Sequence, residues 1–406
     1  MSQHDATPDG VSRRRFLQLG GAAGAAAFLA ASGATSVAAG SRRSPAAGRP
    51  RVADQEASPV VATDGAFRMA TWIGYIDIAD DTSYPSLDRF TAETGVVIDY
   101  QEVVDDNQVF FASDLQGPID AGVPTGWDIV VLTDWMIQRL VALGWLETIG
   151  ASAHGNLAAN LETVYRSRAW DPDNTLAAPY VSGMTGLGYD RKVTGDITSL
   201  SVLFGDTYSG RVTYLSEMND TVGLVAILKG YDPNVLTQEQ FDDCIALVKS
   251  NVDSGVVRNL TGNSYIEDMQ SGDVQLAMAW SGDVAGLLLP SNNDQKEFVW
   301  TLADEGGMIW TDNMAIPKGA ENQPQAERFI DWYYDPANAA QIIAFVRYVC
   351  PVKGAAEALA AIDPSASQDP LIFPTQEMRA RLHDFISQDP DARSAWEATF
   401  QEAIGL

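Results

Sequence analysis

The chain has 406 residues, of which 46% are hydrophobic, and its mean hydropathy is −0.08. This is the composition of a soluble globular protein with enough apolar residues for two lobes, each with its own core. The net charge is −28; the first 51 residues hold seven Arg and two Asp, so the remainder carries 19 basic against 52 acidic residues, a charge of −33. The electrostatic field of this negative charge repels nucleic acid, which we exclude as a partner, and attracts cations. An acidic surface that maintains solubility or suits high salt explains the charge equally well.

The N-terminus has the pattern of an export signal. Residues 12–18, Ser-Arg-Arg-Arg-Phe-Leu-Gln, precede an Ala- and Gly-rich apolar stretch that ends near residue 39. Paired arginines before a weakly hydrophobic segment are typical of a twin-arginine signal peptide, which we assign to residues 1–39, with cleavage near Ala38 in the small-residue motif Ser-Val-Ala. A transmembrane anchor is the alternative, but the high Ala, Gly and Ser content makes membrane insertion unfavourable.

The following segment predicts a protein that acts outside the cytoplasm. Residues 29–33, Leu-Ala-Ala-Ser-Gly, resemble a lipoprotein cleavage box in which Ser32 replaces the cysteine that would carry the lipid. We therefore expect a periplasmic or extracellular protein without a lipid anchor. Residues 40–65 show no hydrophobic periodicity and contain many breakers, so we predict a disordered leader there.

Beyond residue 65, short β-rich runs alternate with helical patterns. Gly95 and Gly144 end the first two helices, and the continuous apolar run at 127–133 is typical of a strand in a parallel sheet. Strand, helix and strand at this spacing predict βαβ units and an α/β fold. The expected strands are 67–73, 96–103, 127–133, 210–215, 273–280 and two short strands within 298–310; the expected helices are 84–94, 135–143, one ending at 229, 237–250, 323–333, 337–346 and one at the C-terminus.

The number and spacing of the cysteines and histidines do not indicate a metal or cofactor site. The chain has two cysteines, Cys244 and Cys350, which are far apart in sequence. We predict two buried thiols, with a disulfide as the alternative. The three histidines, at 4, 154 and 383, have no metal-ligand spacing, so we expect no metal site and no cofactor.

Trp310 and Asp312 form a pair that suits an organic cation. They leave a short hydrophobic strand and enter a turn, two residues apart. The indole supplies a negative π-face and the carboxylate supplies the counter-charge. A buried core tryptophan beside a helix-capping aspartate is the alternative interpretation of the pair taken alone.

Five local motifs together resemble the spermidine/putrescine-binding proteins of ABC importers. Each motif is weak alone, but their order and spacing over residues 66–406 are specific. The motifs are Thr-Trp-Ile-Gly-Tyr (71–75), Phe-Thr-Ala-Glu-Thr-Gly (90–95), Trp-Asp-Ile-Val-Val with Thr-Asp-Trp (127–135), Tyr-Leu-Ser-Glu-Met-Asn-Asp (214–220), and Trp-Ser-Gly (280–282) with Gly-Met-Ile-Trp-Thr-Asp (307–312).

The resemblance implies a two-lobed periplasmic-binding-protein fold with a ligand cleft and a hinge between the lobes. Each lobe is expected to be a mostly parallel sheet flanked by helices. Carried onto this chain, the family's crossover points give a first lobe of 66–182 plus 311–356. The second lobe would comprise 183–310 plus 357–406.

The resemblance also implies a set of ligand-binding residues. An ammonium group in a cleft needs a carboxylate partner, and methylene chains favour flat apolar walls. Taken alone, the acids fit a helix N-terminus and the aromatic residues fit a core equally well. The implied ligand-binding residues are Trp72, Tyr75, Thr133, Asp134, Trp135, Glu217, Asp220, Trp280, Trp310, Asp312 and Tyr348.

One position departs from the family pattern. Relatives often carry Trp-Thr-Glu-Tyr in the first loop, whereas this chain has Ile73 and Gly74 before the tyrosine, so the loop acid is missing. Asp134 and Asp283 are the nearby candidates to replace it. The loss leaves open a diamine or another cation in place of a triamine.

We therefore expect a monomeric receptor that delivers a polyamine to a membrane permease. The first alternative keeps the fold but changes the ligand to a sugar, an anion or a ferric ion; anion and ferric sites would need Arg clusters or Tyr and His ligands in the cleft loops. The second is a secreted enzyme. No nucleophile elbow, P-loop, dinucleotide fingerprint or metal motif is present, and Glu217 and Asp220 lie too close in sequence for a glycosidase pair.

Overall fold

The computed structural model describes residues 65–79, 83–150, 155–384 and 390–405. The predicted signal peptide and its cleavage site lie outside the described residues, as does the predicted leader apart from residue 65. Within the described ranges, no helix combines the length and the apolarity needed to cross a membrane.

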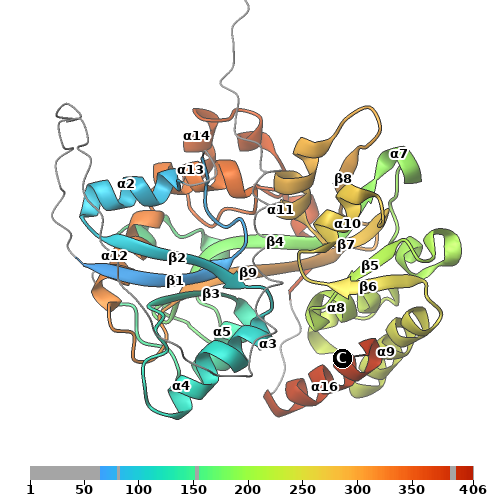
Figure 1. Cartoon of the computed structure of the whole chain (residues 1–406), viewed down its shortest axis with the longest axis horizontal. Coiled ribbons are helices and arrows are strands. Elements are labelled where there is room, and N and C mark those ends of the chain that lie inside the picture. Colours follow the sequence, from blue (N-terminus) through green and yellow to red (C-terminus); the bar gives the residue numbers. More distant parts are fainter. Residues whose placement is uncertain (1–64, 80–82, 151–154, 385–389, 406) are drawn as a thin grey trace, which may run out of the picture.

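A single ten-stranded sheet runs through the molecule (Figure 1). Its main path is β2-β1-β3-β9-β4-β7-β5-β6, with β10 paired to β9 and β8 paired to β4. The strands are β1 Ala66–Trp72, β2 Val97–Val104, β3 Ile129–Thr133, β4 Ala177–Asp190, β5 Val212–Leu215, β6 Val257–Thr261, β7 Leu276–Trp280, β8 Phe298–Thr301, β9 Gly307–Ala315 and β10 Leu382–His383.

We call the part around β1, β2 and β3 the first half and the part around β5, β6 and β7 the second half. Within each half these strands are parallel, as the sequence predicted. In the first half, Gly95 and Gly144 both have the left-handed backbone that ends a helix, at φ 73° and 70°. In the second half, Thr237 and Gln240 form a reciprocal capping box at the start of α9.

Helices cover both faces of the sheet (Figure 1). The α/β class and the predicted long helices are confirmed, with ends that differ by at most three residues. The α-helices are α2 Pro85–Thr94, α3 Asn107–Phe110, α4 Gly117–Asp120, α5 Asp134–Leu143, α6 Gly155–Asn160, α7 Arg191–Thr194, α8 Met218–Leu228, α9 Gln238–Asp253, α10 Tyr265–Ser271, α11 Ser281–Asp283, α12 Gln323–Tyr333, α13 Pro336–Val346, α14 Ala355–Ala360, α15 Gln376–Arg379 and α16 Pro390–Ile404.

Two long antiparallel strands, β4 and β9, join the halves. All fourteen residues of β4 are buried. In the β4–β9 register, Ser182 pairs with Thr311 and Gly183 with Trp310, so the first two expected crossover points lie opposite each other. The sequence pattern does not predict β4, because the Gly, Ala and Pro content of this strand gives a low strand propensity that burial between two neighbouring strands overrides.

Two further features differ from the expectations. The two short strands expected within 298–310 do not pair with each other; β8 and β9 both pair with β4, and β9 continues to Ala315. Past the expected boundary at residue 356, α14 still packs on α13 of the first half. The chain then reaches the second half, where Trp396 of α16 stacks on Phe241 of α9 at 3.9 Å.

The two cysteines are buried and unbonded, which confirms the predicted free thiols. Cys244 packs in the core between α8, α9 and α16. Cys350 lies in the main core that follows the sheet. Burial raises the pKa of each thiol to about 12, so neither is a reactive thiolate at neutral pH.

Candidate functional site

A small cavity lies where the two halves of the sheet meet. It is built from strand ends and the segments that follow them, the place where open α/β sheets bind ligands. Trp72 ends β1, Thr133 ends β3 and Trp280 ends β7. The cavity is lined by Trp72, Tyr75, Asn107, Thr133, Trp135, Glu217, Asp220, Asn263, Trp280, Trp310, Asp312 and Tyr348.

Asp312 is one of three buried acids of the cavity. It lies on β9 opposite Thr133 and is 2% exposed. One carboxylate oxygen, Oδ2, accepts a hydrogen bond from the Tyr75 hydroxyl at 2.5 Å, while Oδ1 is buried without a hydrogen-bond partner among the described residues. Burial raises the Asp312 pKa to about 7, although the hydrogen bond from Tyr75 opposes the shift. A cation donating to Oδ1 would therefore satisfy both the unpaired oxygen and the buried charge.

Two more acids come from the start of α8. Glu217 is its N-cap residue and Asp220 is in its first turn, which brings both carboxylates to the cavity. Asp220 accepts hydrogen bonds from the Thr185 hydroxyl and, at 3.3 Å, from the Trp280 indole. Burial raises the Asp220 pKa to about 7 and also raises the pKa of Glu217, to which the neighbouring acids add repulsion. Like charges this close are stabilised by a cation between them.

Aromatic rings form the walls. Trp310 packs edge-on against Trp280, with ring centroids 6.4 Å apart, and against Tyr348 at 5.2 Å. Two glycines leave the space that these rings occupy. A Cβ on Gly183 would lie 2.3 Å from the Trp310 ring, and one on Gly282 would lie 2.6 Å from the Tyr348 ring.

Several polar atoms of the cavity residues have no partner. The indole nitrogens of Trp72 and Trp135 are buried without an acceptor, and Oδ1 of Asn263 is buried without a donor. With Asp312 Oδ1, the site holds both unpaired acceptors and unpaired donors. Buried polar groups are nearly always satisfied in native proteins, so this pattern fits a site completed by a polar ligand or by water.

Ten of the eleven predicted site residues line this one cavity, and Asp134 does not. Asp134 forms an ion pair with Arg168 at 2.8 Å and faces a different surface depression. The sequence could not reveal this, because Arg168 lies 34 residues away and only the fold brings it to α5. Asp134 therefore has a protein cation as its partner.

The acid missing at Gly74 is not replaced in the cavity by either candidate. Asp283 lies behind the wall, where it accepts hydrogen bonds from Asn263, Tyr265 and Tyr348. The backbone N–H of Gly74 instead donates to Glu102 of β2 at 2.9 Å. Glu102 is not among the residues that line the cavity, so three acids remain there.

Asn107 and Asn263 are cavity residues that the sequence analysis missed. Asn107 holds the two halves together, since its side chain donates to Thr133 of the first half and to Glu217 of the second. Each asparagine follows the end of a strand, β2 or β6. That position was the available signal, but a lone asparagine in a loop fits a turn equally well.

The comparisons with known proteins agree on one family. A model described as bacterial extracellular solute-binding protein matches residues 86–375. The putrescine-binding periplasmic protein PotF of Escherichia coli (strain K12) is 28% identical over 344 residues, which cover 79% of this chain and 86% of the relative.

Solved structures match over the same range. The Tp0655 (TpPotD) lipoprotein of Treponema pallidum has a TM-score of 0.69 and 18% identity, and the match covers 84% of this chain and 100% of the other. The binding protein AgtB from A. tumefaciens R10, solved with agropinic acid, has a TM-score of 0.66 and 18% identity, covering 85% and 100%. These matches confirm the predicted two-lobed periplasmic-binding-protein fold.

Proposed function

Because the chain belongs to the bacterial extracellular solute-binding protein family, we propose that it captures a polyamine, spermidine or putrescine, in the cavity between its halves. It delivers this ligand to the permease of an ABC importer. The protein is a receptor and not an enzyme: it selects its ligand by charge and shape, closes around it and releases it to the transporter. The 28% identity to a protein named as putrescine-binding supports this choice of ligand.

The observation that carries the proposal is the charge of the cavity. Three carboxylates and no Lys or Arg are among the described residues that line it. A buried carboxylate without a counter-charge is unfavourable, and an alkylammonium supplies that charge. The aromatic walls would contact the methylene groups between two ammonium groups and add roughly 0.5–2 kcal/mol for each cation over a ring.

A second ligand class has an observation in its favour. AgtB shares the fold and was solved with agropinic acid, so the architecture accommodates other small solutes. A sugar would also stack on the tryptophans. Three acids in one small cavity favour the cation over either of these.

The receptor works outside the cytoplasm in this proposal. The twin-arginine pattern at residues 12–18 supports export of the folded protein, and Ser32 in place of cysteine supports a form without a lipid anchor. We expect the mature receptor to act as a monomer.

A thermal-shift panel tests the ligand. The mature protein, from about residue 54 onward, would be melted with putrescine, spermidine, spermine, several sugars and common anions. A ligand at 100 times its Kd adds about 2.7 kcal/mol of stability, which gives a clear rise in Tm. We expect a rise with polyamines alone; a rise only with sugars or anions would reject the polyamine assignment.

A further inference from the structure

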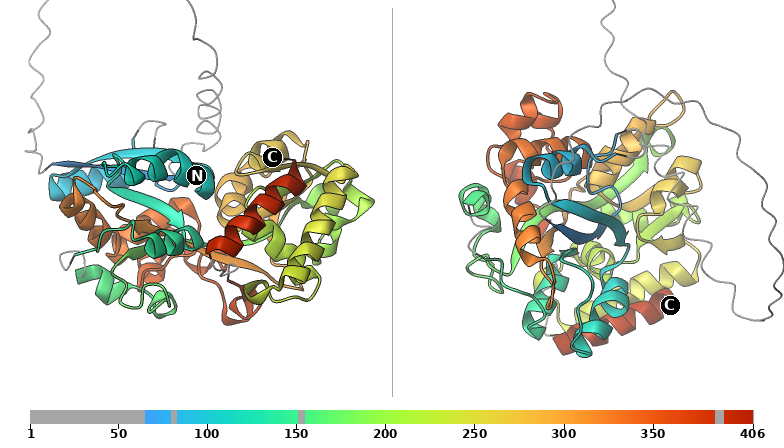
Figure 2. Two further views of the ribbon diagram at one scale, coloured as in Figure 1. Left: turned by 90° about the horizontal axis from the view of Figure 1, so that it is seen from below. Right: turned by 60° about the vertical axis from the view of Figure 1, so that its left-hand side comes forward.

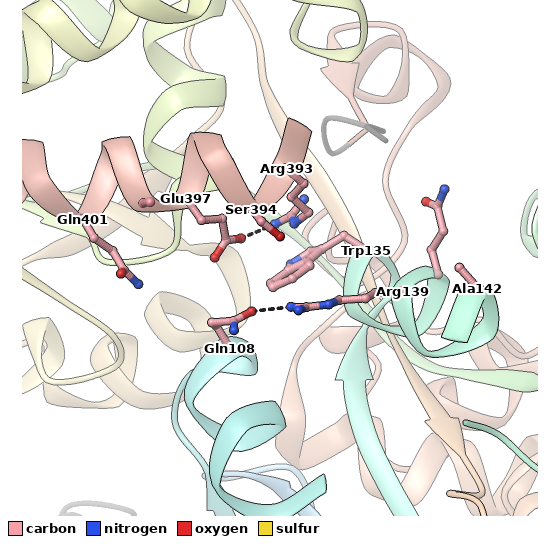
Figure 3. Close-up of a pocket in the computed structure, with 10 residues that line it drawn as sticks. Gln108, Trp135, Arg139, Ala142, Arg393, Ser394, Glu397 and Gln401 are labelled. Carbon is pink, nitrogen blue, oxygen red and sulfur yellow. Dashed lines mark hydrogen bonds and ion pairs between the residues drawn. The ribbon is translucent and has the colours of Figure 1, made fainter. Parts of the chain in front are cut away.

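The C-terminal helix α16 places a cation directly behind the proposed ligand cavity. The guanidinium carbon of Arg393 lies 3.7 Å from the centre of the Trp135 ring. Trp135 lines the cavity and also a crevice between α16 and the helices α3 and α5 (Figure 3). Figure 2 shows α16, in red, at the boundary between the two halves. The indole therefore separates the ligand cavity from a neighbouring cationic site.

Arg393 is unusually buried for an arginine. It is 7% exposed, and its buried Nε has no hydrogen-bond partner in the part of the chain that the structure describes. One of its terminal nitrogens donates to Glu397 at 2.8 Å, one helical turn away. Burial lowers the Arg393 pKa, whereas Glu397 and the cavity acid Glu217 oppose the shift. The positive charge of Arg393 therefore acts on the end of the cavity where Glu217 lies.

A second guanidinium lines the same crevice. Arg139 of α5 lies 4.0 Å over the Phe111 ring and donates to Gln108 at 2.7 Å. In Figure 3, Trp135 lies between the side chains of Arg139 and Arg393. Burial is the main cause of the lowered Arg393 pKa, and repulsion by Arg139 adds to it. A ligand ammonium that extended past Trp135 would meet both of them.

These charges make the two sides of Trp135 opposite in sign. On the cavity side are Glu217, Asp220 and Asp312; on the crevice side are two arginines and one glutamate. A guanidinium already held over the indole also reduces the attraction of that ring for a second cation, so Trp135 favours methylene groups.

We propose that Arg393 is a specificity-determining residue that limits the ligand to a short dication. This inference rests on the proposed function: the cavity acids bind two ammonium groups, and Arg393 repels a third ammonium that would extend past Trp135. Spermidine and spermine, which carry extra ammonium groups, are therefore disfavoured relative to putrescine.

The test measures affinity for putrescine and spermidine in wild type and in Arg393→Gln by isothermal titration calorimetry. Two unit charges about 8 Å apart at an effective dielectric of about 20 interact enough for a change of roughly tenfold or more. We expect the ratio of the spermidine Kd to the putrescine Kd to fall about tenfold in Arg393→Gln. In Arg393→Lys, which keeps the charge, the ratio should stay near the wild-type value.

Arg89→Gln is the matched control, because it removes one positive charge from an exposed position on α2, remote from the crevice. Its ratio should equal that of wild type. An unchanged ratio in Arg393→Gln, with putrescine still bound, would overturn this inference and leave the proposed function intact. Failure of wild type to bind any polyamine would instead overturn the proposed function.

A measurement on the wild-type protein alone covers the case in which Arg393→Gln does not fold. N-Butylputrescine has the length of spermidine but a methyl group in place of one terminal ammonium. Wild type should bind N-butylputrescine more tightly than spermidine. Equal or tighter binding of spermidine would reject repulsion of the third ammonium.

Discussion

The surroundings of one carboxylate oxygen, Oδ1, make Asp312 the proposed cation-binding group of the cavity. Its Oδ2 is held by Tyr75, and its Oδ1 is buried with no donor. The same carboxylate on the surface would be solvated and would attract a ligand only weakly. Burial makes the unpaired oxygen selective for a donor that also carries positive charge.

Asp312→Asn should weaken polyamine binding by about 2–4 kcal/mol, because it leaves a buried ammonium without its counter-charge. Titration calorimetry would measure the loss. Asp88→Asn is the matched control, since Asp88 is exposed on α2 and its substitution changes the net charge equally. If Asp312→Asn kept wild-type affinity, the carboxylate would be structural.

The raised pKa values predict a pH dependence with a defined sign. In the folded protein the pKa of Asp220 and of Asp312 is about 7, above the ordinary aspartate value near 3.9. Their protonation stabilises the ligand-free fold at low pH, and this contribution is lost as the pH rises from about 4 through about 7. A bound cation favours the ionised forms, so it competes with these protons.

The rise in Tm caused by putrescine should therefore be larger at pH 8 than at pH 5.5. Calorimetry at pH 6.5 in two buffers of different ionisation enthalpy should show proton release on binding. A Tm rise that does not depend on pH between 5.5 and 8 would mean that the cavity acids do not titrate with the ligand.

At the scale of single elements, the glycines of β4 decide where the aromatic walls stand. Gly183 faces Trp310 across the β4–β9 pair, and no Cβ fits between them. The strand that joins the halves therefore also shapes the cavity. The cavity therefore requires glycine at position 183 of β4, because a side chain there would fill the space that the Trp310 indole occupies. This requirement contributes to the low strand propensity of β4.

Gly183→Ala should displace the Trp310 indole and lower polyamine affinity by roughly tenfold or more, with a stability loss of about 1–3 kcal/mol from overpacking. Calorimetry and thermal melting would separate the two effects. Gly117→Ala is the control, because Gly117 is helical, with φ −58°, and has open space around its Cβ position. Normal binding by folded Gly183→Ala would show that the position of Trp310 is not critical.

At the scale of the whole molecule, side-chain contacts beside the cavity join the two halves. Asn107 of the first half donates to Glu217 of the second, and Arg393 on α16 lies against Trp135 on α5. Such contacts form when two lobes approach each other around a ligand. The strands β4 and β9 remain continuous through the movement and provide the hinge in our proposal.

Putrescine should therefore lower the radius of gyration measured by X-ray scattering. The Asp312→Asn protein at the same putrescine concentration provides the control and should keep the ligand-free value. A saturated wild-type protein with an unchanged radius would argue against hinge closure.

Local sequence was sufficient to predict much of the fold and of the candidate site of this protein. The α/β class, the long helices with their caps at Gly95, Gly144 and Thr237, and ten of the cavity residues followed from periodicity, capping signals and the matched motifs. These features depend on residues within a few positions of one another, or on motifs whose order is preserved along the chain.

Only the tertiary structure decided the rest. It identified β4 as a strand, paired Asp134 with Arg168, and brought Asn107 to Glu217 and Arg393 to Trp135. Each of these depends on partners that are distant in sequence, and burial by such partners overrides local propensity. The same holds for the charge of the cavity, since an acid becomes a cation site only when the fold removes its solvent and leaves it without a protein cation.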